Sequence, residues 1–121
     1  DFPNCFVLGF TQTGVTPNAT HMLDEQASQM AYIVKQVRAR GAKTVEATAE
    51  GEAEWCAICD SYGNKTEQLL AQCTPGYYNN EGGKANKNGF ISGQYGGGAV
   101  KFFKILEEWR NEGNLKGLEV R

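Results

Sequence analysis

The hydrophobic residues at the start of this 121-residue chain form two different patterns, a continuous run and a helical repeat. Residues 4–9 form a short, mostly apolar run, which predicts a buried strand. From about His21, apolar residues recur every three or four positions, which predicts a long amphipathic helix that Gly41 ends. The residues at this helical spacing are Met22, Leu23, Gln26, Ala27, Met30, Ile33, Val34 and Val37. The chain therefore opens with a strand, a loop and a helix.

The loop between these two elements is rich in small and polar residues. Asn18 or Thr20 can cap the helix, because either side-chain oxygen can accept from the N–H groups of the first turn, which lack partners within the helix. A strand, a small-residue loop and a helix N-terminus together make a place where a polar or anionic cofactor edge can dock. An ordinary strand–loop–helix connection has the same pattern.

The rest of the chain predicts mainly helices. Residues 43–47 are expected to be extended, and Thr48 can cap a helix whose inner face is aromatic and sulfur-rich. A second amphipathic pattern predicts a helix over residues 99–110 that ends near Gly113. Residues 115–120 are expected to form a strand or an extended tail. The fold class is therefore α/β, with a large share of helix.

Composition narrows the possible partners. The chain is 40% hydrophobic with a formal net charge of −2, which fits one modest core and argues against a nucleic-acid partner. No apolar run is long enough to span a bilayer, and no signal peptide opens the sequence, so we expect no membrane partner and a cytoplasmic location. A strand at the N-terminus with few candidate partner strands downstream indicates a piece of a larger protein.

The cysteines allow two kinds of chemistry. Cys56 and Cys59 form a Cys-x-x-Cys pair after a Trp, as in thiol-redox sites, but the pair falls inside an acidic helical pattern that would raise a thiol pKa. A zinc site could combine this pair with Cys73 and either His21 or Cys5. Because a single pair is a weak metal signature, we expect a packed helix face with free thiols and no metal.

Three other features can contribute to a site. The glycine-rich residues 93–98 precede a helix and could cradle a phosphate, but they lack the strand and the acidic residue of a dinucleotide fingerprint. His21 could hydrogen-bond a cofactor or simply lie at the surface. Tyr77 and Tyr78 could line an apolar pocket or pin their loop to the core.

Five of these stretches occur in one order. Residues 2–9 with Asn18 and residues 22–26 come first, followed by residues 45–55, the turn at 79–83, the glycine turn at 95–98 and the closing helix. In this order and spacing the chain resembles the C-terminal segment of Baeyer–Villiger-type flavin monooxygenases. The resemblance covers essentially the whole sequence.

The resemblance implies that residues 1–41 are the end of a Rossmann-like FAD-binding domain, with its last strand and helix. Residues 42–121 would be a C-terminal helical and loop segment that lines the substrate pocket. Such enzymes use FAD and NADPH to insert one atom of O₂ beside a ketone, giving an ester or a lactone.

The resemblance also implies the site residues. Asn18, Ala19 and Thr20 would lie against the flavin, and the substrate cavity would be bordered by Thr16, Pro17, Tyr77 and Tyr78. The nucleotide fingerprints, the family's histidine motif and its catalytic arginine would all precede Asp1, so the 121 residues alone are expected to be inactive and to hold no catalytic residue. The alternatives are an N- or S-hydroxylating flavoprotein, a small thiol-redox protein using Cys56 and Cys59, and a non-catalytic binding module.

Overall fold

The computed structural model describes residues 2–62, 72–76, 81 and 94–121. The elements in this part of the chain are α1 (Ala19–Ala39), β1 (Val45–Ala47), α2 (Ala49–Ser61), α4 (Ala99–Glu112) and β2 (Leu118–Val120). Helix therefore dominates, which confirms the prediction of a helix-rich fragment.

Helix α1 forms where the apolar period predicts it. The Asn18 side chain is the N-cap, because its Oδ1 accepts a hydrogen bond from the backbone N–H of His21 at 3.0 Å. Gly41 has a φ of +69°, a left-handed conformation that costs glycine little and ends the helix. The buried residues of α1 are Met22, Gln26, Ile33 and Val37.

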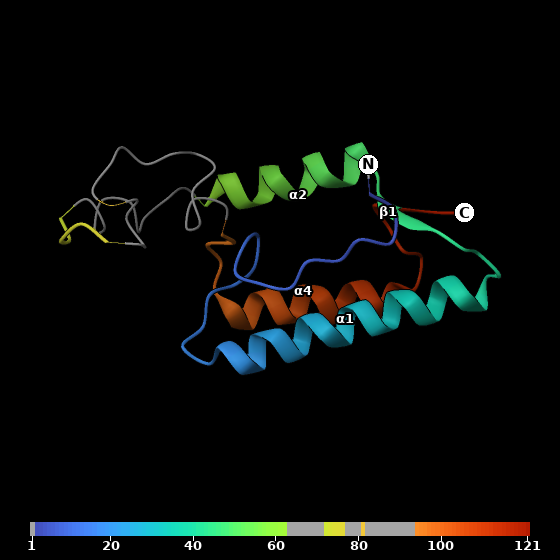
Figure 1. Ribbon diagram of the computed structural model, residues 1–121, viewed down its shortest axis with the longest axis horizontal. Coiled ribbons are helices and arrows are strands. Elements are labelled where there is room, and N and C mark those ends of the chain that lie inside the picture. The colour runs from blue at the N-terminus through green and yellow to red at the C-terminus, as the bar shows by residue number, and fades with distance from the viewer. Residues whose placement is uncertain (1, 63–71, 77–80, 82–93) are drawn as a thin grey trace.

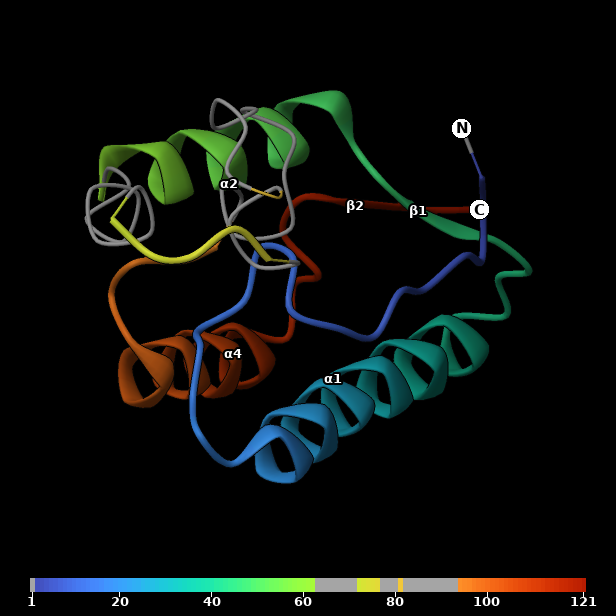
Figure 2. The same cartoon turned by 60° about the vertical axis from the view of Figure 1, so that its left-hand side comes forward.

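The helices lie in two layers. Helices α1 and α4 run side by side in the same direction, and α2 crosses the other side of the molecule in the opposite direction (Figure 1). Polar contacts join the first pair: the Tyr32 hydroxyl donates to the Arg110 carbonyl at 2.8 Å, and the Arg110 guanidinium donates to the Gln29 side chain at 3.1 Å. The space between the layers is where the chain's N-terminal segment passes (Figure 2).

The two short strands close the end of the molecule opposite the start of α1. They pair antiparallel, with Val45 opposite Val120 and Ala47 opposite Leu118. Val45 packs with Ile33 and Val37 of α1 in a buried cluster. The prediction of an extended segment at each position is confirmed.

The sequence predicts a buried strand at residues 4–9, but this chain alone forms no strand there. Residues 2–8, here called the open stretch, have no regular secondary structure and are exposed, with Phe2 and Val7 at 82% and 79%. Asn4 anchors the stretch, since its side chain accepts from Val45 N–H at 3.0 Å and donates to the Lys43 carbonyl at 3.1 Å. A strand needs a neighbouring strand for its N–H and C=O groups. The described residues place none beside residues 5–8.

Candidate functional site

A turn at residues 9–14, here called the held turn, connects the open stretch to the approach to α1. Gln26 of α1 binds it through both ends of its side-chain amide: Oε1 accepts from Gly9 N–H at 3.0 Å, and Nε2 donates to the Gly9 carbonyl at 2.8 Å. The Thr13 hydroxyl lies within hydrogen-bond distance of the Gly9 and Phe10 carbonyls and of the Met22 sulfur. Gln26, Thr13 and Met22 are all buried, so these bonds form away from water.

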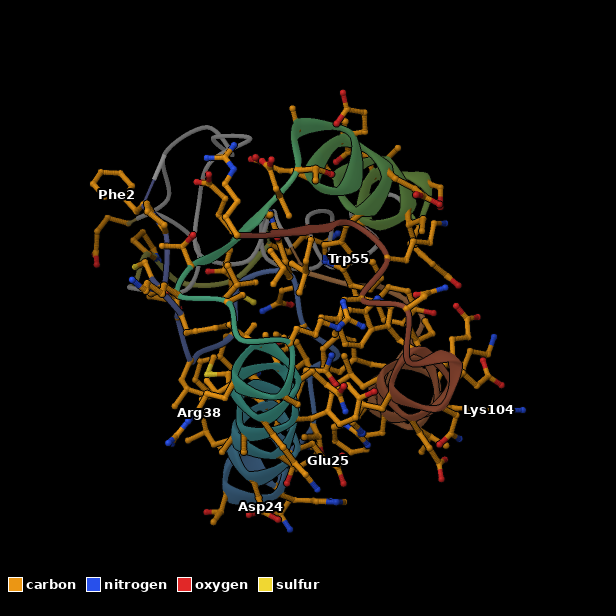
Figure 3. The ribbon with its side chains drawn as sticks, turned by 90° about the vertical axis from the view of Figure 1, so that its right-hand side faces the viewer. Phe2, Asp24, Glu25, Arg38, Trp55 and Lys104 are labelled. Atoms are coloured by element: carbon orange, nitrogen blue, oxygen red, sulfur yellow. The ribbon has the colours of Figure 1, made fainter. Side chains whose placement is uncertain are left out.

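Helix α2 holds the same turn from the opposite side. The Trp55 indole N–H donates to the Gln12 carbonyl at 3.2 Å, and the Gln12 amide donates to the Cys56 sulfur at 3.6 Å. Figure 3 shows Trp55 pointing from α2 into the interior. Gln12 has a φ of +58°, a strained conformation for a residue other than glycine, which persists only where the surroundings fix it.

Helix α4 contacts the turn through a glycine. A Cβ added at Gly14 would lie 2.8 Å from the Phe102 Cβ and 2.9 Å from the Ala99 Cα, so only glycine fits without a shift. Tyr95 N–H donates to the Thr13 carbonyl at 3.1 Å beside this contact. The held turn is therefore fixed by α1, by α2 and by the start of α4.

The held turn rests on an aromatic cluster. Trp55 stacks on Tyr95 with ring centroids 5.6 Å apart, and the Tyr62 and Tyr95 hydroxyls are 3.1 Å apart. This hydrogen bond and burial raise the pKa of Tyr95 to about 12. The glycine-rich run serves the same packing, because a Cβ at Gly96 would lie 2.6 Å from the Tyr62 Cβ. These contacts favour the packing interpretation of the run over a phosphate cradle.

The start of α1 presents the predicted cofactor residues. The Asn18 N–H donates to the Thr16 hydroxyl at 3.2 Å, so Thr16, Pro17 and Asn18 form one compact approach to the helix. The backbone N–H groups of Ala19 and Thr20 have no acceptor among the described residues. The first turn of α1 also carries no acidic residue. Two free donors at the positive end of a helix, with no carboxylate beside them, suit a polar or anionic ligand.

Other predicted site residues lie elsewhere. Tyr77 and Tyr78 fall outside the described residues. His21 faces α4, where its ring centroid is 4.8 Å from that of Phe103, and its Nε2 is 3.9 Å from a Glu25 oxygen. His21 therefore joins the contact between α1 and α4.

Cys59 lacks the low thiol pKa that a redox site needs. Burial, followed by the nearby Cys56 and Asp60, raises the pKa of the Cys59 thiol to about 11, whereas redox thiols need a low pKa. Cys5, Cys56 and Cys59 take part in no disulfide. Nowhere in that part do three or more His, Cys, Asp or Glu side chains gather in a way that could hold a metal ion.

A cavity of about 530 Å³ opens between α2 and α4. Its walls are mainly apolar, from Trp55, Ile58, Phe102, Ile105, Leu106 and Trp109. Two polar groups at its edge already pair, since the Lys116 Nζ and a Glu54 oxygen are 2.8 Å apart. Among the predicted site residues that the structure describes, none lines this cavity.

The sequence interpretation missed the residues that hold the turn. Gln26 was placed on the apolar face of its helix by spacing alone, and a glutamine among core positions was a signal that its amide has a buried partner. The partner, Gly9, lies 17 residues away in a segment predicted as strand, so the pairing itself had no local signal.

Curated relatives match this chain over nearly all of its length. Neopentalenolactone D synthase of Streptomyces avermitilis is 43% identical over 99% of this chain and 20% of the relative. A Baeyer–Villiger monooxygenase of Stachybotrys chlorohalonatus is 39% identical over 98% of this chain and 19% of the relative. An FAD-binding monooxygenase of Hypomyces subiculosus is 31% identical over 98% of this chain and 19% of the relative. The chain thus spans about one fifth of the length of these relatives. No family model matches it.

Solved structures give the same result for the fold. The polycyclic ketone monooxygenase of the thermophilic fungus Thermothelomyces thermophila matches with a TM-score of 0.79 and 27% identity, over 99% of this chain and 19% of that one. An oxidized steroid monooxygenase bound to NADP matches with a TM-score of 0.74 and 22% identity, over 98% of this chain and 20% of that one. The predicted resemblance to Baeyer–Villiger-type monooxygenases is confirmed. The N- or S-hydroxylating alternative is not favoured by these matches.

Proposed function

We propose that this chain is the C-terminal segment of a Baeyer–Villiger-type monooxygenase, here called the parent enzyme, that uses FAD and NADPH to oxidise a ketone. The similarity over 99% of the chain to neopentalenolactone D synthase carries this proposal. When bound, the flavin supplies the redox chemistry, with electrons from NADPH, by which one atom of O₂ is inserted beside the ketone. The chain's own residues supply position and electrostatics.

The proposed flavin contact is the start of α1. The free N–H groups of Ala19 and Thr20 would donate to acceptor atoms of the flavin edge, with Asn18 beside them. The helix dipole would stabilise negative charge that gathers there, by about 0.3–1 kcal/mol. Thr16 and Pro17, which precede the helix, would border the substrate cavity together with Tyr77 and Tyr78.

The division of the chain follows from the same proposal. Residues 1–41 would end the FAD-binding domain, with the open stretch completed as a strand by a neighbouring strand of a Rossmann-like sheet. The exposed apolar side chains of the open stretch support this, and so does the backbone of residues 6–8, which has no hydrogen bond to the described residues, because a strand partner would satisfy both. Residues 42–121 would form the C-terminal helical segment. None of the described helices is both long and apolar enough to cross a membrane, and the cytoplasmic location stays a prediction.

The activity is tested on the purified parent enzyme. Incubated with NADPH, O₂ and a set of cyclic ketones, it should show a bound flavin spectrum, ketone-dependent NADPH oxidation and a product heavier by one oxygen atom. A protein without flavin, or one that oxidises NADPH without a heavier product, would contradict the proposal.

The flavin contact is tested by proline at the first helical position. Ala19→Pro removes one free N–H but leaves α1 able to form, because proline is well tolerated at that position. We expect flavin affinity to fall by about two- to tenfold, as for one lost hydrogen bond. Ala49→Pro is the matched control, since Ala49 is the first residue of α2. Equal flavin affinity in both variants would remove Ala19 from the site.

A further inference from the structure

We propose that Gln26 is a positioning residue that sets where the start of α1 stands against the flavin. That the ligand is a flavin rests on the proposed function. The role of Gln26 rests on its contacts with the held turn. Gln26 touches no part of the proposed flavin site directly and acts through residues 9–14.

The Gln26 amide acts on the turn as a strand neighbour would. Its Oε1 and Nε2 atoms bond the N–H and C=O of one residue, Gly9, at 3.0 and 2.8 Å. Gln26 is 6% exposed, so water cannot replace these bonds when they break. A buried amide is kept in a core only when both of its ends are satisfied.

Fixing Gly9 fixes the path to the helix start. Thr13, at the far end of the turn, bonds back to the Gly9 carbonyl and lies against the Met22 sulfur in the first turns of α1. Gln12, between these anchors, has the strained φ of +58°. Without the Gln26 amide the strained turn is free to relax, and the relaxation moves the chain that leads into Asn18.

The test compares two substitutions of glutamine in α1 of the parent enzyme. Gln26→Met keeps the length and volume of the side chain and removes both hydrogen bonds. Gln36→Met is the matched control, because Gln36 is on the same helix and its side chain has no hydrogen bond to the described residues. Two signals are measured: hydrogen exchange at the Gly9 amide, and the visible circular dichroism of the bound flavin.

We expect Gln26→Met to speed exchange at Gly9 by about tenfold or more and to change the flavin signal. Gln36→Met should leave both unchanged. Gln26→Glu keeps an acceptor for the Gly9 N–H but sets its second oxygen against the Gly9 carbonyl, so it should also speed exchange at Gly9 and change the flavin signal. If Gln26→Met does not fold, Gln26→Glu decides the question by the same two signals.

The experiment distinguishes a failure of the positioning role from a failure of the proposed function. Faster exchange at Gly9 with an unchanged flavin signal would overturn the positioning role and leave only a structural bond. Unchanged exchange would overturn the proposed role of the amide altogether. A wild-type parent enzyme without bound flavin would instead overturn the proposed function, while the exchange at Gly9 would still report on the turn.

Discussion

The open stretch and the held turn are adjacent in sequence and opposite in environment. Residues 2–8 are apolar and exposed, and their structural anchor is Asn4 (Figure 3 shows Phe2 projecting away from the body). Residues 9–14 contain small and polar residues, yet α1, α2 and the start of α4 all bind them. The polar turn is thus bound on several sides within this chain, whereas the described residues leave the apolar stretch exposed. In the proposed parent enzyme, a neighbouring strand would join at this stretch.

Placing a charged residue in the open stretch is expected to give the largest change in the free energy of unfolding. In the 121-residue chain alone, Val7→Asp should change the free energy of unfolding by no more than about 0.5 kcal/mol, because Val7 is 79% exposed. In the parent enzyme the same change should cost about 3 kcal/mol or more, since a completed strand would bury the carboxylate. Unfolding of both proteins in urea measures the difference.

Val100→Asp is the control for this prediction. Val100 is 83% exposed and lies in the first turn of α4, where an acidic residue agrees with the helix dipole. It should be tolerated in both proteins. An equally small effect of Val7→Asp in both would show that the open stretch stays uncovered, and the proposed strand would fail.

The sequence predicts what local pattern determines. Helix α1 was predictable because its apolar period, its Asn18 cap and its Gly41 stop all lie within one segment. Whether residues 4–9 form a strand was not predictable, because an apolar run becomes a strand only beside another strand, and strand pairing is not a local property. The bonds from Gln26 to Gly9 and from Trp55 to Gln12 join segments 17 and 43 residues apart, so no window of sequence contained them.

Filling the contact under the held turn gives the next largest effect. Gly14→Ala places a methyl group against Phe102 and Ala99, so the turn and α4 must separate, at a cost of about 1–3 kcal/mol. Gly76→Ala is the control, because among the described residues the atom nearest to its added Cβ would be the Thr74 oxygen, at 3.8 Å. Local hydrogen exchange in α4 measures the loss. Equal exchange in the two variants would mean that the turn can move away from α4 freely.

Removing one donor to the turn gives a smaller effect. Trp55→Phe keeps an aromatic ring in the cluster and loses the N–H that binds the Gln12 carbonyl, which should cost about 0.5–1.5 kcal/mol. Trp109→Phe makes the same chemical change at the exposed bond to the Lys116 carbonyl and should cost less. Thermal unfolding of the two variants ranks them. The reverse order would contradict the view that the held turn is the better protected region.

The rates at which Cys5 and Cys59 are alkylated compare the exposed open stretch with the buried aromatic cluster. Cys5 lies exposed in the open stretch, and Cys59 lies buried in the aromatic cluster with Tyr95 and Phe102. With its pKa raised from 9.0 to about 11, Cys59 should be about 100-fold less ionised at pH 8 than an ordinary thiol. Alkylation of the 121-residue chain followed by mass spectrometry should therefore modify Cys5 first and Cys59 last. In the parent enzyme, Cys5 should also become protected if a neighbouring strand covers it.

The same pKa shift predicts a loss of stability that begins only in alkaline solution. Below pH 9 the Cys59 thiol is protonated in both the folded and unfolded chain, so it adds no pH dependence. Between pH 9 and about 11 the unfolded chain loses this proton while the folded chain keeps it, so stability falls as pH rises. Tyr95 continues the fall from pH 10 to about 12. Cys59→Ala should remove the first part of the decline in urea unfolding, and an unchanged slope would show that Cys59 ionises freely in the fold.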